Sequence, residues 1–197
     1  MPSLVVPYRG AKGKSRLGLP GSERTVLAEA MLDDVVAACM TVGPTYVVGP
    51  MDDPPAEVTL VPDPGGGQGP AVRAGLEVAA LAAGGVGPLV VVNADLPCVT
   101  PRDLFALAGA VPSAGLALTA AADGTTNALA LARPGLFVPL YGPGSAARFA
   151  ALAPSRRVDA PNLIDDVDTL ADLERLRKRL GPHTRSVLTS LRFGAAA

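Results

Sequence analysis

The sequence predicts an α/β fold: a single domain in which a mostly parallel sheet lies between two layers of helices, a three-layer α/β/α arrangement. Short apolar runs rich in β-branched residues alternate with segments of helical spacing, a pattern typical of parallel sheets covered on both faces. The run Leu89–Val92 is apolar at four successive positions, as a central strand buried on both faces should be. No linker-like tract divides the 197 residues, and that length suits one sizeable domain.

The strands and the first helices follow from these patterns. The predicted strands are Leu4–Pro7, Thr45–Val48, Val58–Val61, Leu89–Val92, Leu116–Thr119 and Ala128–Leu131. A first helix is predicted over residues 24–40, where an apolar face recurs every four residues, at Leu27, Met31, Val35 and Cys39. A second helix is predicted over residues 70–82 after a glycine-rich loop, and a third begins at Pro101, with Thr100 as its N-cap.

The end of the chain carries a different signal. Leucine and valine recur at spacings of three and four between Leu163 and Leu180, which predicts one amphipathic helix over this stretch. We place the domain at residues 1–181 and expect residues 182–197 to form a loosely ordered C-terminal tail, above all from Gly194 onward.

Composition excludes several classes of function. The formal net charge is −1 and no basic stripe appears, so nucleic acid is not an expected partner. No signal-peptide layout is present, and no apolar run approaches the roughly 18 residues of a membrane-spanning helix, so we expect a cytoplasmic protein without membrane contact. Cys39 and Cys98 are read as core residues. Because His183 is the only histidine, the chemistry should rest on carboxylates, lysine, arginine and backbone amides.

The segment after the first predicted strand is a basic loop. Gly10 and Gly13 are interleaved with Lys12, Lys14 and Arg16. Gly13-Lys14-Ser15 matches only the end of a Walker A motif, because position 8 is a tyrosine where that motif needs glycine. Two interpretations stay open: a loop that surrounds a triphosphate with amides and cations, or a solvated basic turn.

A second loop contains three consecutive glycines followed by Gln68. Glycines of this kind allow the backbone to approach a ligand closely, and the Gln68 amide could pair with a base edge or a ribose. The spacing does not fit the dinucleotide motif GxGxxG, because Pro70 and Val72 occupy the positions where its last glycine would fall. A flexible turn that precedes a helix is the alternative.

Carboxylates mark two further places. Asp95 follows the central strand, and ligands of open α/β sheets bind outside the carboxyl ends of the strands. It could bind magnesium or serve as a turn residue. Asp165, Asp166 and Asp168 come just before Thr169 and Asp172, whose spacing is that of a capping box and indicates a helix start inside the leucine pattern. Acids also suit a helix N-terminus. Asp166 and Asp168, two apart in an extended segment, would point the same way and could share a metal with Asp95.

The last candidate site lies between residues 123 and 149. Thr125, Thr126 and Asn127 lead into the sixth predicted strand, and the turn Gly142–Ser145 opens a short helix that carries Arg148. A helix start of this type with an arginine one turn in can bind a phosphate or a carboxylate. An ordinary N-cap accounts for the same residues.

Taken in this order, the motifs resemble the guanylyltransferases that form the phosphoenolpyruvate or 2-phospho-L-lactate adduct in the biosynthesis of the deazaflavin coenzyme F(420). The resemblance covers roughly residues 3–180, and its carriers are AKGKSRL (11–17), GGGQGPAVRAGL (65–76), NADLP (93–97), GTTNAL (124–129), GPGSAARF (142–149) and DDVDTLADL (165–173). It implies a nucleotide-diphospho-sugar transferase-like fold of the GT-A, Rossmann-like type.

The resemblance also implies a reaction and its residues. A phosphate oxygen of the acceptor would attack the α-phosphorus of GTP, and pyrophosphate would leave. Mg²⁺ would be held by Asp95, Asp166 and Asp168. The catalytic residues would be Lys12, Lys14, Arg16 and Asp95. The acceptor would be bound by Thr126, Gly142, Ser145 and Arg148, and the nucleotide by Gly10, Lys14, Gly67, Gln68, Gly69 and Asn93.

Some alternatives stay open at this point. Phosphoenolpyruvate and 2-phospho-L-lactate are both possible acceptors, and a downstream transferase is a possible partner that collects a labile product. A molybdenum-cofactor or sugar-1-phosphate nucleotidyltransferase on the same fold is the main rival. A nucleotide-binding protein without turnover and a purely structural α/β domain are the other two.

Overall fold

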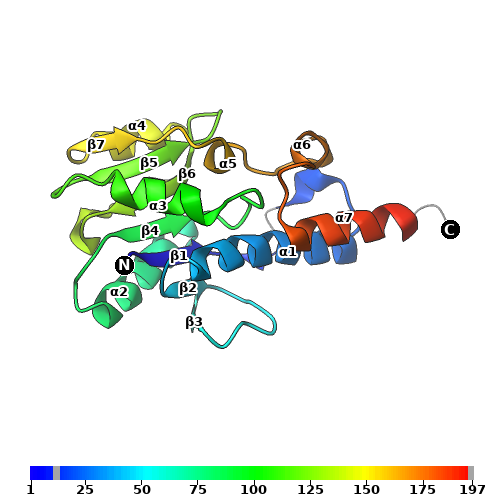
Figure 1. The fold of residues 1–197 in the computed structure, drawn as a ribbon, viewed down its shortest axis with the longest axis horizontal. Helices are drawn as coiled ribbons and strands as arrows, with labels where there is room; N and C mark the ends of the chain where they lie inside the picture. The colour runs from blue at the N-terminus through cyan, green and yellow to red at the C-terminus, as the bar shows by residue number, and fades with distance from the viewer. Residues whose placement is uncertain (11–13, 195–197) are drawn as a thin grey trace.

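A seven-stranded sheet forms the centre of the molecule (Figure 1). The computed structural model describes residues 1–10 and 14–194. The strands are β1 (Ser3–Pro7), β2 (Thr45–Val48), β3 (Val58–Val61), β4 (Leu89–Val92), β5 (Leu116–Ala120), β6 (Thr126–Leu131) and β7 (Ser155–Arg157). Their spatial order is β3-β2-β1-β4-β6-β5-β7. The six predicted strands are therefore confirmed, and β7, a short edge strand of exposed polar residues, was not predicted.

The sheet is mostly parallel, as expected. Strands β1, β2, β3 and β4 run parallel to one another, and β5 runs parallel to β7. Strand β6 is antiparallel to both of its neighbours, β4 and β5. This reversal brings the start of β6 beside the carboxyl end of β4, where Ala128 pairs with Val92.

Helices cover both faces of the sheet. The helices are α1 (Gly21–Met40), α2 (Gln68–Ala82), α3 (Pro101–Gly109), α4 (Ser145–Ala150), α5 (Pro161–Ile164), α6 (Leu170–Leu176) and α7 (Pro182–Gly194), with short 3-10 turns at Ser15–Leu17 and Pro134–Leu136. Two apolar clusters result, one with α1, α3, α5, α6 and α7, the other with α2 and α4. The predicted three layers are confirmed.

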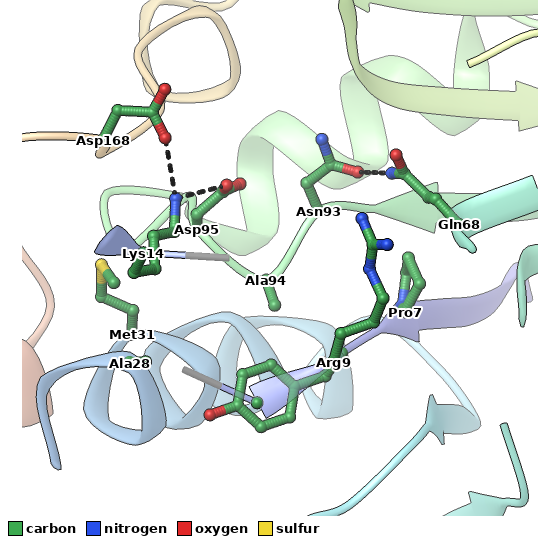
Figure 2. Close-up of a pocket in the computed structure, with 12 residues that line it drawn as sticks. Pro7, Arg9, Lys14, Ala28, Met31, Gln68, Asn93, Ala94, Asp95 and Asp168 are labelled. Atoms are coloured by element: carbon green, nitrogen blue, oxygen red, sulfur yellow. Dashed lines mark hydrogen bonds and ion pairs between the residues drawn. The ribbon is translucent and has the colours of Figure 1, made fainter. Parts of the chain in front are cut away.

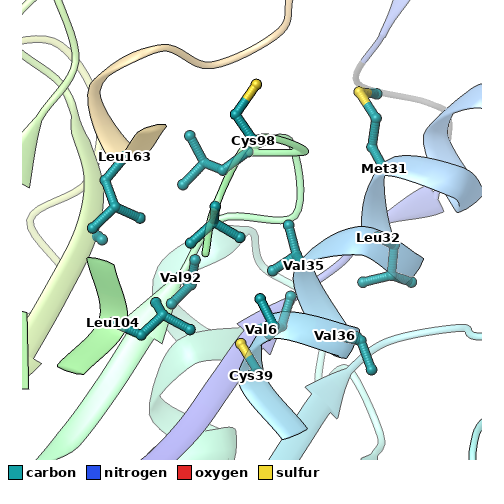
Figure 3. Close-up of a cluster of buried hydrophobic side chains, with 14 of the residues drawn as sticks. Val6, Met31, Leu32, Val35, Val36, Cys39, Val92, Cys98, Leu104 and Leu163 are labelled. Carbon is teal, nitrogen blue, oxygen red and sulfur yellow. The ribbon is translucent and has the colours of Figure 1, made fainter. Parts of the chain in front are cut away.

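Successive residues of a strand belong alternately to the two clusters, because their side chains point to opposite faces of the sheet. Val6 and Val92 pack with α1 and α3, as Figure 3 shows around Met31, Val35 and Leu104. Val5 and Val91 pack with α2 on the other face. Helix α2 approaches the sheet closely at Gly75, where an added Cβ would lie 2.5 Å from Val5 Cγ1.

The prediction of one helix over residues 163–180 was wrong. Helix α5 ends at Ile164, residues 165–168 are not helical, and α6 begins only at Leu170. Thr169 caps α6 in a capping box with Asp172: the backbone N–H of Asp172 donates to Thr169 Oγ1, while the Thr169 N–H donates to the Asp172 carboxylate. Leucines of α5 and α6 share a spacing because both helices pack onto one core, although Leu170 at the start of α6 is exposed.

The expectation of a loose tail after Gly181 was also wrong over residues 182–194, which form α7 beside α1 (Figure 1). Asp34 of α1 explains the start of this helix. Its buried carboxylate accepts the backbone N–H groups of His183 and Thr184, each at 2.9 Å. Residues 195–197 lie outside the described part of the chain.

Two further expectations concern the chain as a whole. Cys39 and Cys98 are free and buried, which confirms that they are core residues. Among the described residues, no helix combines the length and the apolar character that crossing a membrane requires.

Candidate active site

A pocket of about 200 Å³ lies at the carboxyl ends of β1 and β4 (Figure 2). The chain supplies its wall from five places: the segment after β1, helix α1, the start of α2, the segment after β4, and the segment before α6. The lining residues are Pro7, Tyr8, Arg9, Gly10, Lys14, Ala28, Met31, Gln68, Asn93, Ala94, Asp95 and Asp168. The location agrees with the expectation that ligands bind where parallel strands end.

Lys14 lies between two carboxylates in this pocket. Its Nζ donates to Asp95 Oδ2 at 2.7 Å, to Asp168 Oδ1 at 3.1 Å and to the carbonyl of Val167 at 2.6 Å. Burial alone would lower the pKa of Lys14, but the charges and hydrogen bonds of Asp95 and Asp168 outweigh it and hold the pKa above its ordinary value. The side chain is therefore an ammonium ion, with only 12% of its surface exposed.

Arg16 adds a second cation at the rim of this site. Its Nη1 lies 3.3 Å from Asp168 Oδ2, and the arginine side chain is largely exposed. Gly10 lines the pocket with a φ of 70°, a left-handed conformation that favours glycine. Lys12, the remaining cation predicted for this loop, lies outside the described residues.

Asp95, Asp166 and Asp168 come together as the sequence predicted. Each offers one carboxylate oxygen, and these oxygens all lie within 4.8 Å of one another. The backbone N–H of Val167 donates to the carbonyl of Asp95 at 3.0 Å and so holds the extended segment against the end of β4. Burial, followed by the nearby charge of Asp95, raises the pKa of Asp166 above its ordinary value.

Gln68 and Asn93 form the opposite side of the pocket. Gln68 Nε2 donates to Asn93 Oδ1 at 2.8 Å, and Asn93 Nδ2 donates to the carbonyl of Thr126 at 3.3 Å. Gly67 is the N-cap of α2, with a φ of 101°. Gly69 instead packs against Pro139, where a Cβ would lie 2.5 Å from the proline Cβ. Gln68 and Asn93 therefore line the pocket, and Gly69 is buried in packing.

The residues predicted for the acceptor gather beside the start of β6. The hydroxyls of Thr126 and Ser145 are buried and lie 2.9 Å apart. Ser145 also donates its backbone N–H to the carbonyl of Gly142. The Arg148 guanidinium turns back on its own loop, where Nη1 donates to the Pro143 carbonyl at 2.6 Å and Nη2 to the Leu140 carbonyl at 2.8 Å.

Comparison with known proteins gives two kinds of match. The model of the MobA-like NTP transferase domain matches residues 13–187. Proteins named phosphoenolpyruvate guanylyltransferase match over most of their length: one from Sphaerobacter thermophilus is 36% identical and covers 87% of this chain and 90% of its own, and one from Geodermatophilus obscurus is 37% identical and covers 94% and 93%. The chain belongs to the phosphoenolpyruvate guanylyltransferase family. It is thus a nucleotidyltransferase.

Solved structures agree on the fold of this nucleotidyltransferase. A protein from Desulfovibrio desulfuricans described as a nucleotide-diphospho-sugar transferase superposes with a TM-score of 0.72 at 15% identity and covers 96% of this chain and 94% of its own. The 2-C-methyl-D-erythritol 4-phosphate cytidylyltransferase from Thermus thermophilus gives 0.60 at 17% identity and covers 89% and 97%. The expected nucleotide-diphospho-sugar transferase-like fold is confirmed.

The acidic triad of this family member suits a hard divalent cation. Its donor atoms are all carboxylate oxygens, which Mg²⁺ prefers. Asp95 Oδ1 is buried and has no hydrogen-bond partner among the described residues. A buried carboxylate oxygen without a partner is costly, and a bound cation would satisfy it.

Arg9 is a pocket residue that the sequence interpretation did not select. It lines the same pocket as Gln68 and Asn93 (Figure 2). The signal was present, because Arg9 comes two residues after the end of β1, and the rule of ligand binding at strand ends had already selected Asp95 after β4. Tyr8 was missed as well, and burial raises its pKa to about 12, so it is a neutral phenol in the pocket wall.

Proposed function

We propose that this nucleotidyltransferase transfers GMP from GTP to phosphoenolpyruvate, or to the related 2-phospho-L-lactate, and releases pyrophosphate. The product is then a diphosphate that links guanosine to a three-carbon acid, as in the biosynthesis of the deazaflavin coenzyme F(420). The names of the relatives that are 36% and 37% identical support guanylyl transfer to phosphoenolpyruvate. A cytoplasmic location and a downstream transferase that takes the labile product belong to the same proposal.

The convergence of Lys14, Asp95 and Asp168 on one pocket is the observation that carries the proposal. Transfer of a phosphoryl-type group depends mainly on positioning and on charge stabilisation. The Lys14 ammonium can oppose the charge that develops on the departing pyrophosphate. The attacking phosphate oxygen of the acceptor is already anionic, so this reaction needs no strong general base.

A divalent cation completes the charge balance of the site. Asp95, Asp166 and Asp168 would hold Mg²⁺, and the bound ion would neutralise phosphate charge. Asp95 would then contact both Lys14 and Mg²⁺. Its Oδ2 already accepts from Lys14, and its Oδ1, which has no partner among the described residues, is free for the ion.

The acceptor belongs beside the start of β6. The Thr126 and Ser145 hydroxyls form a buried pair, and hydroxyls can donate to the oxygens of a phosphate or a carboxylate. On the other side, the Gln68–Asn93 pair offers amide groups for a base edge or a ribose. Arg9 is a further cation within reach of the nucleotide, because it lines the pocket with these two residues.

Pyrophosphate release tests this function directly. The purified protein is incubated with GTP and Mg²⁺ and, in separate reactions, with phosphoenolpyruvate, 2-phospho-L-lactate or a sugar 1-phosphate. We expect release with one of the three-carbon acceptors and none with the sugar phosphate. Asp95→Ala should abolish it, whereas Asp159→Ala should not, because Asp159 is 77% exposed and pairs with Arg157, away from the pocket lining.

Two outcomes would contradict the proposal. Release with the sugar 1-phosphate alone would favour the rival nucleotidyltransferase. No release with any acceptor, even after addition of the partner transferase, would exclude the assignment, because a product held on the enzyme would then have been removed.

A further inference from the structure

Asn127 is a buried polar residue whose side chain hydrogen-bonds to a segment outside the sheet. It is the second residue of β6 and only 2% of its surface is exposed. Thr126, just before it, directs its hydroxyl to Ser145. Because side chains of a strand alternate between faces, Asn127 points to the opposite face, where its Nδ2 donates to the carbonyl of Ile164 at 3.0 Å.

This bond fixes the segment that carries two of the three acids. Helix α5 ends at Ile164, and residues 165–168 belong to no helix or strand, so no regular ladder determines where Asp166 points. The Asn127 bond holds the start of this segment, and the bond from Val167 N–H to the Asp95 carbonyl holds its far side. Asp166 lies between these two anchors.

Other hydrogen bonds and ion pairs of this segment, among the described residues, engage Asp165 and Asp168. The Asp165 carboxylate pairs with Arg175 and Arg179 on the outer side, and the Asp168 backbone N–H donates to Asp172 at 3.3 Å. Among the described residues, Asn127 is the side chain from the sheet that anchors the backbone just before Asp166. It is held in turn from β4, because the Asn93 N–H donates to the Asn127 carbonyl at 3.0 Å.

We propose that Asn127 is a positioning residue that directs the Asp166 carboxylate toward Asp95 and Asp168, and so sets the affinity of the triad for a divalent cation. The inference rests on the cation of the proposed function. Outer partners that orient a metal ligand commonly change metal affinity by about 10- to 100-fold when they are removed. The start of β6 would thus serve both sides of the site, through Thr126 on one face and Asn127 on the other.

Asn127→Leu tests this role, because it removes the amide and keeps a side chain of similar volume. The matched control is Thr119→Val. Thr119 on the neighbouring strand β5 is fully buried, and its hydroxyl donates to the Val158 carbonyl at 2.9 Å. Thr119→Val therefore removes the same kind of buried bond to a following segment, at a residue eight positions before Asp166 rather than two. Thermal unfolding of both variants establishes that each is folded.

The readout is the binding of Mn²⁺ alone, measured without nucleotide from the electron paramagnetic resonance signal of the free ion. We expect Asn127→Leu to weaken Mn²⁺ binding at least tenfold and Thr119→Val to change it less than twofold. If Asn127→Leu does not fold, Asn127→Ser is measured in the same way, since it also shortens the side chain out of reach of Ile164.

Three results would overturn the inference: unchanged Mn²⁺ affinity in a folded Asn127 variant, an equal loss in Thr119→Val, or no binding by the wild-type protein. The Mn²⁺ measurement distinguishes failure of this inference from failure of the proposed function. A wild-type chain that binds Mn²⁺ but transfers no GMP to any acceptor would contradict that function and leave the role of Asn127 intact.

Discussion

Lys14 is the residue on which the charges of the site converge. Its ammonium contacts Asp95, Asp168 and the Val167 carbonyl from a largely buried position. We expect Lys14→Met to lower kcat/KM for GTP by about 10²- to 10³-fold, the usual loss when one preorganised charge-stabilising donor is removed. Lys178→Met is the control, because Lys178 is exposed and lies outside the pocket. Equal losses in both variants would contradict a specific role for Lys14.

Under the proposed function, Ser145 binds the acceptor and not the nucleotide. Its hydroxyl lies 2.9 Å from that of Thr126 and is not part of the wall that Gln68 and Asn93 form. Ser145→Ala should raise the KM for the three-carbon acceptor about tenfold, which corresponds to about 1.4 kcal/mol, with little change in the KM for GTP. Steady-state kinetics with each substrate varied in turn measure both values. A rise confined to GTP would place the hydroxyl pair on the wrong substrate.

The meeting of Asp95, Asp166 and Asp168 follows from simple rules. Asp95 comes soon after the end of β4, and Asp166 and Asp168 alternate in an extended segment, so the sequence could predict that these carboxylates lie close together. Arg9 follows the same strand-end rule, although the sequence interpretation did not select it, whereas Asn127 obeys no such local rule. Asn127 acts through Ile164, which lies 37 positions away, and only the packing of α5 against β6 reveals that contact.

Among the elements, α7 depends most visibly on a single side chain. Asp34 accepts the N–H groups of His183 and Thr184 and lies so close to Gly181 that a Cβ there would be 2.2 Å from its Cγ. Asp34→Ala leaves these buried donors without a partner, and we expect it to lower the free energy of unfolding by about 1–3 kcal/mol. Urea denaturation measures the change.

The neighbouring residue supplies the control for this prediction. Asp33→Ala removes a carboxylate from the same helix that is only partly buried, and we expect a smaller loss. Similar losses in the two variants would mean that the charge on α1, rather than the cap of α7, determines stability.

The segment between α5 and α6 should make the protein sensitive to acid. Burial would raise the pKa values of Asp165 and Asp172, but hydrogen bonds to Asp165 from Arg179 and Arg175, and to Asp172 from Thr169 and Arg175, hold both below their ordinary value of 3.8. A depressed pKa means that the unfolded chain binds more protons, so this stability is complete above about pH 4 and is lost as the pH falls further.

Arg175→Gln isolates this contribution, because Arg175 pairs with both carboxylates. We expect the difference in unfolding free energy between wild type and variant to shrink as the pH is lowered from 5 to 2, as measured by urea denaturation at each pH. A difference that does not vary over this range would contradict the assignment of the two pKa values.

Residues 163–180 also show why an element can be mispredicted. The leucine spacing reports which side chains face a common core, and α5 and α6 share that core. It does not report that the backbone between them is extended. The local evidence for a break in the helix was the pair Thr169 and Asp172. Their spacing is that of a capping box, which marks a helix start inside the predicted helix.

At the scale of the whole molecule, we expect the buried core to become accessible to reagents only when the protein unfolds. Cys39 and Cys98 are buried, and burial is the main cause that raises their thiol pKa values to about 12 and about 11. Since the thiolate is the reactive form, both should resist a thiol reagent at pH 8 in the native state and react after addition of urea. Fast labelling of either residue in the native protein would contradict the packing described above.

Sequence analysis predicts the layers of the fold more readily than the order and direction of its strands. Apolar runs and helical spacings determine the layers, because each element has to bury its apolar face. The reversed direction of β6 had a readable sign: only five residues separate β5 from β6, whereas a parallel connection needs a dozen or more. The order of the strands and the place of the edge strand β7 depend on contacts across the whole chain, and no local pattern encodes them.

The path of the phosphate label from GTP tests the central claim most directly. The protein is incubated with Mg²⁺, phosphoenolpyruvate and GTP labelled with ³²P at either the α or the γ position. Transfer of GMP predicts that the α label enters an adduct with the acceptor and that the γ label leaves in pyrophosphate. A γ label on the acceptor, or a γ label released as inorganic phosphate without an adduct, would contradict the account, because the chain would then be a kinase or a GTPase.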